Sequence, residues 1–351
     1  IPEGPQSITA RASDAAGNQS AATAGLSVEI DVTEPEQINV LRQNPSSSPT
    51  NADALTWDYE FTEEIVNLDA TDFSVLNSTA TITSIVNPVS TTSRITISGG
   101  NLASVNASVT LQLSGGNDIT DIAGNALSNA GPTGTSQNNY IVDNTRPTIS
   151  STSTSPSLTD PTSTTPFTFF IQFNEAINPI VIGDITVSGA TLDNFANPGA
   201  NLFSVEVTPS GDGTITLDVA ENETTDLAGN GNVAATQFSV EFDGTRPTVA
   251  ITSTETSPTN AAVIPLTITF SESVSGFFVL DENNGDVTVS SGTLSNFAGS
   301  GTTYTLDLTP AGDGPINVNI AQNVAQDAAN NLNTAATQFT ISSDWTNPTV
   351  S

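Results

Sequence analysis

The chain has 351 residues and a net charge of −32, with 37 acidic side chains against five basic ones, all of them Arg. Such a charge disfavours nucleic acids and anionic membrane surfaces as partners, and it favours cations. His and Cys are absent, which excludes disulfides and thiolate metal sites and removes common catalytic groups, and no stretch has the length and apolarity of a membrane-spanning helix.

Two sequence motifs repeat along the chain with one shared period. Asp-x-Thr-x-Pro begins at Asp31, Asp143, Asp243 and Asp344, at intervals of 112, 100 and 101 residues. Asp-x-Ala-Gly-Asn begins at Asp14, Asp121 and Asp226, and a degenerate copy begins at Asp327. Two motifs with a common period predict a tandem array. The predicted segments are the end of a preceding repeat at 1–31, complete repeats at 32–143, 144–243 and 244–344, and the start of a next repeat at 345–351.

Residues 1–30 are similar to the last third of a repeat. Alternation at 7–12 and at 26–30 predicts two strands on either side of the loop at Asp14. Two strands cannot close a sandwich, so this segment should be the least stable part. Because the chain starts inside a repeat and stops just after a linker, we expect it to be a segment of a much longer protein.

Each complete repeat contains short strands separated by turns. The predicted strands are 55–61, 72–75, 109–113 and 139–142 in the first repeat; 167–173, 184–187, 203–207, 215–219 and 237–242 in the second; and 266–270, 286–289, 304–308, 316–320 and 338–341 in the third. About seven short strands per hundred residues, without a convincing helix, predict an all-β immunoglobulin-like sandwich for each repeat. Trp57, Phe73, Phe173, Phe270 and Phe297 are expected in the cores rather than on a sugar-binding surface.

Two further motifs keep the same order in the repeats. Phe-x-Glu ends at Glu63, Glu175 and Glu272, and Gly-Asp-Gly turns contain Asp212 and Asp313. With these four motifs the whole chain resembles the bacterial immunoglobulin-like tandem repeats of giant cell-surface adhesins, which include biofilm, ice-binding and gliding-motility adhesins. The resemblance implies an extended, secreted rod at the bacterial cell surface, and Ca²⁺ at the domain joints of several members.

The expected topology brings the acidic motifs together. In a seven-stranded sandwich the second strand returns towards the upstream linker, and the loop before the last strand lies at the same end. We therefore expect three acidic clusters, with the Gly-Asp-Gly acids near the following joints, in an arrangement that resembles cadherins. The candidate ligands are Asp31, Glu63 and Asp121; Asp143, Glu175 and Asp226; Asp243, Glu272 and Asp327; and Asp212 and Asp313. Ca²⁺ binds six to eight oxygens, and three close carboxylates repel without a cation.

Two other interpretations remain open for these residues. Asp and Asn before Gly also form turns through local backbone hydrogen bonds. Arg146 and Arg246 lie inside the second and third linkers, where they would neutralise the acids as ion pairs, although Glu34 and Asn347 occupy that place in the other linkers.

We expect a structural stalk rather than an enzyme. Every acid that recurs does so at equivalent places in the repeats, whereas a catalytic pair would occur once, in a cleft. Pro at each joint and a bound cation would restrict hinge motion, so that the repeats hold a distal adhesive region away from the cell. The partners are then Ca²⁺ and neighbouring repeats of the same chain. The alternative is that the repeats themselves bind a surface ligand, such as a polysaccharide or another cell.

Overall fold

The computed structural model describes residues 2–128, 131–199, 201–279 and 285–349. Ile1, Val350 and Ser351, which belong to the first and last predicted segments, lie outside the described residues. The chain divides into two compact units, Ile1–Pro147 with Thr224–Asn232, and Thr148–Glu223 with Val233–Ser351. In the parts described, no helix is long and apolar enough to cross a membrane. The repeat boundaries at 32, 144, 244 and 345 remain predictions.

The first unit starts with a β-hairpin. Strands β1 (Gly4–Ile8) and β2 (Leu26–Ile30) pair antiparallel, with Gly4 opposite Ile30. The strand predicted at 26–30 is confirmed, but the one predicted at 7–12 was wrong at its end, because residues 9–12 leave the strand. Ile8 and Leu26 stay largely exposed, since this hairpin has no second sheet to pack against.

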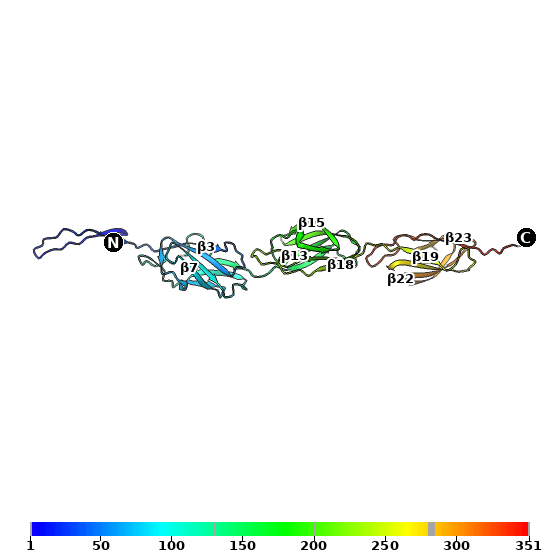
Figure 1. Ribbon diagram of the computed structural model, residues 1–351, viewed down its shortest axis with the longest axis horizontal. Coiled ribbons are helices and arrows are strands. Elements are labelled where there is room, and N and C mark those ends of the chain that lie inside the picture. Colours follow the sequence, from blue (N-terminus) through cyan, green and yellow to red (C-terminus); the bar gives the residue numbers. More distant parts are fainter. Residues whose placement is uncertain (1, 129–130, 200, 280–284, 350–351) are drawn as a thin grey trace. The chain divides into compact units, whose positions relative to one another are not determined.

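A sandwich of two sheets follows in the first unit (Figure 1). One sheet has the order β3 (Gln37–Asn44), β4 (Ala54–Phe61), β8 (Thr92–Ser98) and β7 (Thr81–Val86). The other has the order β11 (Asn139–Val142), β9 (Ala107–Leu113) and β6 (Phe73–Leu76), and β6 follows the short helix η1 (Ala70–Asp72). Trp57 and Tyr140 meet edge to face in the core, with ring centroids 4.9 Å apart.

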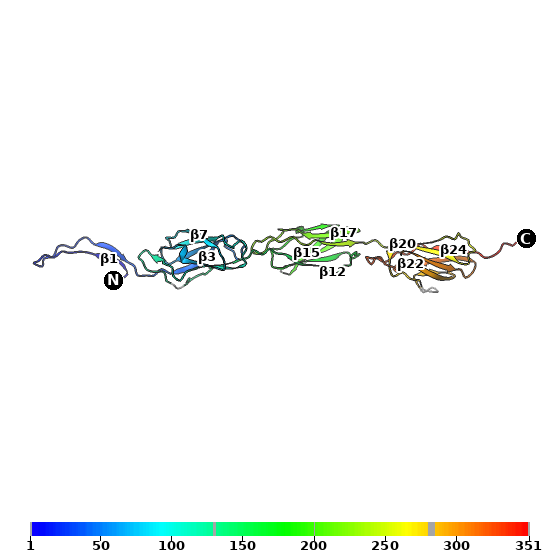
Figure 2. The same cartoon turned by 90° about the horizontal axis from the view of Figure 1, so that it is seen from below.

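The second unit contains two more sandwiches. In the first of them, one sheet has the order β12 (Ile149–Ser155), β13 (Phe167–Phe173), β16 (Leu202–Pro209) and β15 (Ala190–Gly199). The other sheet has the order β14 (Ile185–Ser188), β17 (Gly213–Val219) and β18 (Phe238–Phe242), and the short helix η2 (Ile182–Asp184) precedes β14. Figure 2 shows β12 and β15 in one layer and β17 in the other. In the second of them, one sheet has the order β19 (Val249–Ser253), β20 (Ile264–Val274) and β22 (Thr293–Thr309). The other sheet has the order β21 (Val287–Val289), β23 (Gly314–Ile320) and β24 (Phe339–Ser343).

Period-two alternation produces these strands. Along β13 the side chains of Phe167, Phe169, Ile171 and Phe173 are buried and those between them are half-exposed, as expected when one face of a strand packs on a core. Within the described residues, buried hydrophobic side chains form three separate clusters, one in each sandwich. The all-β fold of tandem immunoglobulin-like sandwiches is confirmed, and the five aromatic residues predicted for the cores lie in or against them.

Short backbone pairings position the acidic motifs. In the first sandwich β10 (Thr120–Asp121) pairs with β5 (Ile65–Val66), which places Asp121 opposite Ile65, two residues beyond Glu63. In the third sandwich Ser275 and Gln326 exchange both backbone hydrogen bonds, at 2.7 and 3.0 Å. Since Gln326 precedes Asp327 and Ser275 follows Glu272, the two acidic loops lie beside each other in both sandwiches.

Candidate metal centres

The first acidic set lies wholly within the first unit. Carboxylate oxygens of Asp31, Glu63 and Asp121 lie within 4.8 Å of one another, with Asp121 buried and the other two half-buried. Asp121 Oδ1 accepts hydrogen bonds from the backbone N–H groups of Gly124 (2.6 Å) and Asn125 (2.8 Å). The Asn125 side-chain nitrogen donates to Asp121 Oδ2 (2.7 Å) and to the carbonyl oxygen of Asp31 (3.2 Å). This Asn therefore ties the loop to the linker; we call the arrangement the asparagine clasp.

The third acidic set, in the second unit, has the same clasp. Oxygens of Asp243, Glu272 and Asp327 lie within 4.8 Å of one another. The Asn331 side-chain nitrogen donates to the carbonyl oxygen of Asp243 (2.7 Å) and to Asp327 Oδ2 (3.0 Å). The motif is degenerate here because Asn330 replaces Gly, yet Asn330 takes the left-handed conformation (φ 69°) that Gly124 takes at φ 95°. Asn tolerates this region better than most residues, which explains why the loop keeps its form.

The residues of the second set divide between the units. Asp143 and Asp226 belong to the first unit and Glu175 to the second. Within the first unit the Asn230 side-chain nitrogen donates to the carbonyl oxygen of Asp143 and to Asp226 Oδ2, each at 2.8 Å. The clasp thus forms in all three copies of the loop that follow a complete linker.

In the Asp31 and Asp243 sets, burial and the neighbouring acids raise the pKa of the Glu. The pKa of Glu63 is raised by desolvation and then by the charges of Asp31, Asp121 and Glu3. The pKa of Glu272 is raised by desolvation and then by Asp327, Asp243 and Asp212. Burial opposes ionisation of Asp121, but the hydrogen bonds from Asn125, Gly124 and Ala123 outweigh it and lower its pKa. In the Asp31 and Asp243 sets the neighbouring carboxylates therefore oppose ionisation of the Glu, and a bound cation would relieve this repulsion.

The donor set fits a hard cation. Three carboxylates offer up to six oxygens, and they come from three separate chain segments that converge on one point. Ca²⁺ accepts six to eight oxygen ligands in flexible geometry, whereas Zn²⁺ prefers the sulfur and imidazole ligands that this chain lacks.

Asp212 and Asp313 hold the linkers that follow them. Asp212 Oδ1 accepts from the N–H of Gly244 (2.7 Å), and its Oδ2 accepts from the hydroxyl of Thr245. Asp313 accepts in the same way from Trp345 N–H (2.7 Å) and Thr346 Oγ1 (2.6 Å). The threonine hydroxyl bond, with the backbone bond, lowers the pKa of each carboxyl. In the described residues neither carboxylate joins a cluster of three acids, so their role as metal ligands stays a prediction.

The linker arginines bind carbonyl groups. Arg146 donates to the carbonyl oxygens of Gly231 (2.8 Å) and Asn232 (2.7 Å). Arg246 donates to the carbonyl oxygens of Leu332 (2.6 Å) and Asn333 (2.8 Å), and to Asn323 Oδ1 (2.7 Å). Among the residues described, Arg246 makes no ion pair, so it does not neutralise its acidic set in the way that the sequence left open.

Comparison with known proteins identifies a family. The model of the family described as "Bacterial Ig-like domain" matches residues 143–242 and 243–343. No curated protein sequence matches the chain.

Three solved structures illustrate the matches, all at low sequence identity. Invasin, described as a bacterial integrin-binding protein, is 12% identical with a TM-score of 0.33, covering 87% of this chain and 59% of its own. InvD of Yersinia pseudotuberculosis is 12% identical with a TM-score of 0.35, covering 88% and 97%. Domains 4–9 of the surface layer protein SbsC are 11% identical with a TM-score of 0.21, covering 96% and 46%.

Proposed function

The chain belongs to the bacterial Ig-like domain family, and we propose from this premise that it is a structural stalk segment of a large bacterial cell-surface adhesin. Its repeats, residues 32–143, 144–243 and 244–344 in this proposal, extend a distal adhesive region from the cell. Tandem sandwiches with separate cores support this role, because length is gained by adding units that each fold around their own core.

Ca²⁺ at the joints is the second part of the proposal. The observation that carries it is the convergence of linker Asp, strand-end Glu and loop Asp in the Asp31 and Asp243 sets, within 4.8 Å. The buried Asp of each set is preorganised by the clasp, so a cation would meet ligands that are already oriented. Bound Ca²⁺ would fix the linker to the domain that follows it and reduce hinge motion.

Each ligand has a distinct mechanical role in this proposal. Asp243 lies in the linker, Glu272 lies in the last part of β20 of the following sandwich, and Asp327 belongs to the loop before its last strand. A cation bound to all three would join the linker to two loops of one domain. The clasp from Asn331 already links two of these segments, and the cation would join the third, Glu272, to them.

Small-angle scattering of the full chain, with calcium and then with chelator, tests this function. We expect the maximum dimension and the rigidity to fall when calcium is removed, and we expect the Asp243→Asn, Glu272→Gln, Asp327→Asn variant to lose part of that calcium response. Asp53→Asn, an exposed acid outside the sets, is the matched control and should respond like the wild type. A maximum dimension that is the same with calcium and with chelator would contradict the proposal that calcium stiffens the stalk.

A further inference from the structure

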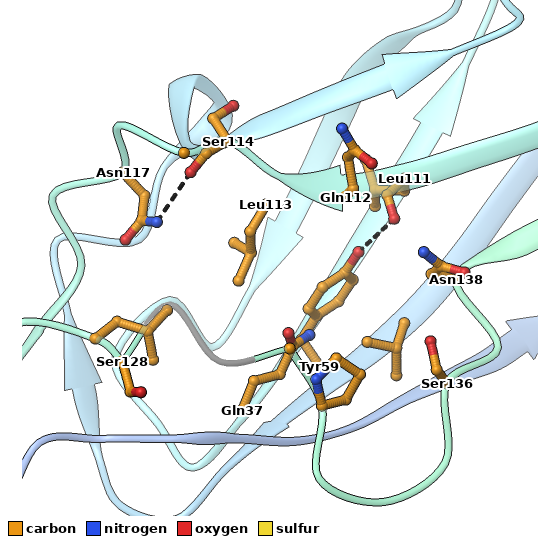
Figure 3. A pocket seen from close by; sticks show the side chains of 15 residues that line it. Gln37, Tyr59, Leu111, Gln112, Leu113, Ser114, Asn117, Ser128, Ser136 and Asn138 are labelled. Carbon is orange, nitrogen blue, oxygen red and sulfur yellow. Dashed lines mark hydrogen bonds between the residues drawn. The ribbon is translucent and has the colours of Figure 1, made fainter.

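The first sandwich contains a pocket of about 320 Å³ between its two sheets. Figure 3 shows its wall, with Gln37 and Ser136 on one side and Gln112 and Ser114 on the other. Tyr59 forms part of the floor, where its hydroxyl donates to the carbonyl oxygen of Leu111 at 2.8 Å. Its volume lies at the lower end of the range of about 300–1,000 Å³ typical of small-molecule sites.

A longer segment before the last strand explains the pocket. Residues 126–138 separate Asn125 from β11, whereas the shorter segments 231–237 and 332–338 occupy this place in the other sandwiches. The added residues pair with the edge of β3: Val40 N–H donates to Thr135 O (2.9 Å), Gln137 N–H to Val40 O (2.8 Å), and Gly134 N–H to Ile38 O (2.8 Å). The segment therefore runs along β3 and leaves the end of β9 uncovered.

The other two sandwiches close the same place. In the second, Ala235 N–H donates to Val219 O (2.9 Å), and in the third, Ala336 N–H donates to Ile320 O (3.0 Å), so the segment is tied to the central strand. The corresponding void in the second sandwich has a volume of about 10 Å³ and is lined mainly by apolar side chains. In the first sandwich no described residue makes this bond to Leu113, the counterpart of Val219 in the strand register.

Gln37 is the residue that marks the pocket as a binding site. It faces Phe61 in the strand register, where the second and third sandwiches have Ile149 opposite Phe173 and Val249 opposite Phe270. Gln37 is 6% exposed, and its side-chain amide has no hydrogen-bond partner among the described residues. Its amide lines the pocket, so a polar occupant can both donate hydrogen bonds to it and accept hydrogen bonds from it.

The chemistry of the wall selects the occupant. None of the fifteen lining residues is charged, although the chain carries a net charge of −32. The side chains of Gln37, Gln112, Ser136 and Asn138 have no hydrogen-bond partner among the residues that the structure describes, and amides and hydroxyls both donate and accept. Apolar surface comes from Val40, Leu113, Leu127 and Pro132.

We propose that this pocket binds one neutral sugar residue, free or at the end of a glycan. The hydroxyls of a sugar match the paired donors and acceptors of the amides, and its ring carbons match the apolar part of the wall. Peptide termini, nucleotides and acidic sugars carry charges that this wall does not balance. The site is independent of the acidic sets, so its failure would leave the stalk proposal standing, and the reverse also holds.

Saturation-transfer NMR on the full chain tests the pocket with D-glucose, D-galactose, D-mannose, N-acetyl-D-glucosamine and D-glucuronate. We expect at least one neutral sugar to bind and D-glucuronate not to bind. Gln37→Ile installs the residue of the second sandwich and should weaken binding at least tenfold, while Gln43→Ile, the same change at an exposed position of β3, should leave it unchanged. Ser136→Ala removes one wall hydroxyl and should also weaken binding, should Gln37→Ile disturb folding.

An oligosaccharide ending in the bound sugar distinguishes the two sources. Tighter binding of the oligosaccharide identifies the end of a glycan as the occupant, and equal binding identifies the free sugar; both support the pocket. Absence of binding by every neutral sugar, equal binding of D-glucuronate, or full binding by a folded Gln37→Ile chain overturns the proposal.

Discussion

The Asp31 set lies wholly in the first unit and the Asp243 set wholly in the second. Both have an asparagine clasp, but the contacts of their linkers differ. In the Asp243 set, Asp212 of the preceding sandwich accepts two hydrogen bonds from the linker. Arg246 binds two carbonyl oxygens that follow the Asp327 loop and one side-chain oxygen that precedes it. In the Asp31 set, Thr33 Oγ1 donates to Glu3 of the hairpin (2.8 Å), and Glu34 occupies the position of Arg246.

This difference shows that the linker motif takes part in two separate interactions, the clasp and the contacts that hold the linker. The clasp depends on the Asp and Asn of one loop, so it forms wherever that motif is present. The contacts that hold the linker in place, which we call its bracing, depend on the element before the linker and on the fourth residue of Asp-x-Thr-x-Pro. Because this residue is Arg246 in one linker and Glu34 in the other, the bracing varies. We therefore expect the two sets to have similar metal chemistry and unequal mechanical stability.

Removing the buried Asp should have the largest effect, and an equal one in both sandwiches. Asp121→Ala and Asp327→Ala each delete the acceptor of the backbone and side-chain donors of the clasp, which should cost about 2–3 kcal/mol of unfolding free energy in chelator. Calorimetry of the full chain measures the loss, with Asp53→Ala as the exposed control. A loss in only one of the two sandwiches would break the claim that the clasp is common to both.

Exchange of the fourth motif residue should have the next largest effect. Arg246→Glu gives the third linker the residue of the first and removes charge-assisted hydrogen bonds to Leu332 and Asn333, so we expect a loss of about 2 kcal/mol from the third sandwich. Urea unfolding and calorimetry of the full chain measure this loss of stability. The reciprocal Glu34→Arg change should not destabilise the first sandwich, and comparable losses from both changes would contradict the assigned bracing role.

Loss of the linker hydroxyl should be smaller. Thr245→Val removes the donor to Asp212 but keeps the Gly244 N–H bond, so we expect a loss of about 1 kcal/mol. Thr33→Val should cost less, since Glu3 lies in an exposed hairpin where water replaces the bond. Chemical denaturation of the two variants decides this, and an equal or larger loss from Thr33→Val would remove the distinction between the two linkers.

The pH dependence should be the smallest effect and similar in both sets. Without calcium, the folded-state pKa values of Glu63 and Glu272 are raised above their unfolded values, so the folded chain binds these protons more tightly. Their contribution to stability therefore rises as pH falls through the raised pKa and levels off below the unfolded pKa. Glu272→Gln should flatten this part of the pH profile of thermal unfolding in chelator, and an unchanged profile would show that the acids do not interact.

The strands and the meeting of the acidic motifs follow from sequence periodicity. Asp-x-Thr-x-Pro, Phe-x-Glu and Asp-x-Ala-Gly-Asn share one period, and sandwich topology places them at one end of each repeat. Two of the missed strands, β7 and β15, lie at sheet edges, where most side chains are exposed and alternation is weak. Strand β8 was missed although it lies inside its sheet and its side chains alternate in burial. Whether the acids bind metal stays a prediction, because turn formation alone would also favour Asp and Asn in these loops.

The spacing of two motifs in the sequence gives a signal for the pocket of the first sandwich. Asp121 and Asp143 are 22 residues apart, whereas the same interval is 17 residues from Asp226 to Asp243 and from Asp327 to Asp344. The spacing shows that the first repeat has added residues before its last strand. It does not show where they go, because their pairing with β3 depends on tertiary contacts that no local pattern encodes.

A high-resolution crystal structure of the chain grown with calcium tests the central claim most directly. We expect a cation in the Asp243 set, with oxygens of Asp243, Glu272 and Asp327 at about 2.3–2.6 Å from it. Carboxylates that point apart around ordered water in the presence of saturating calcium, with the clasp of Asn331 intact, would contradict the account and leave turn formation as the role of these acids.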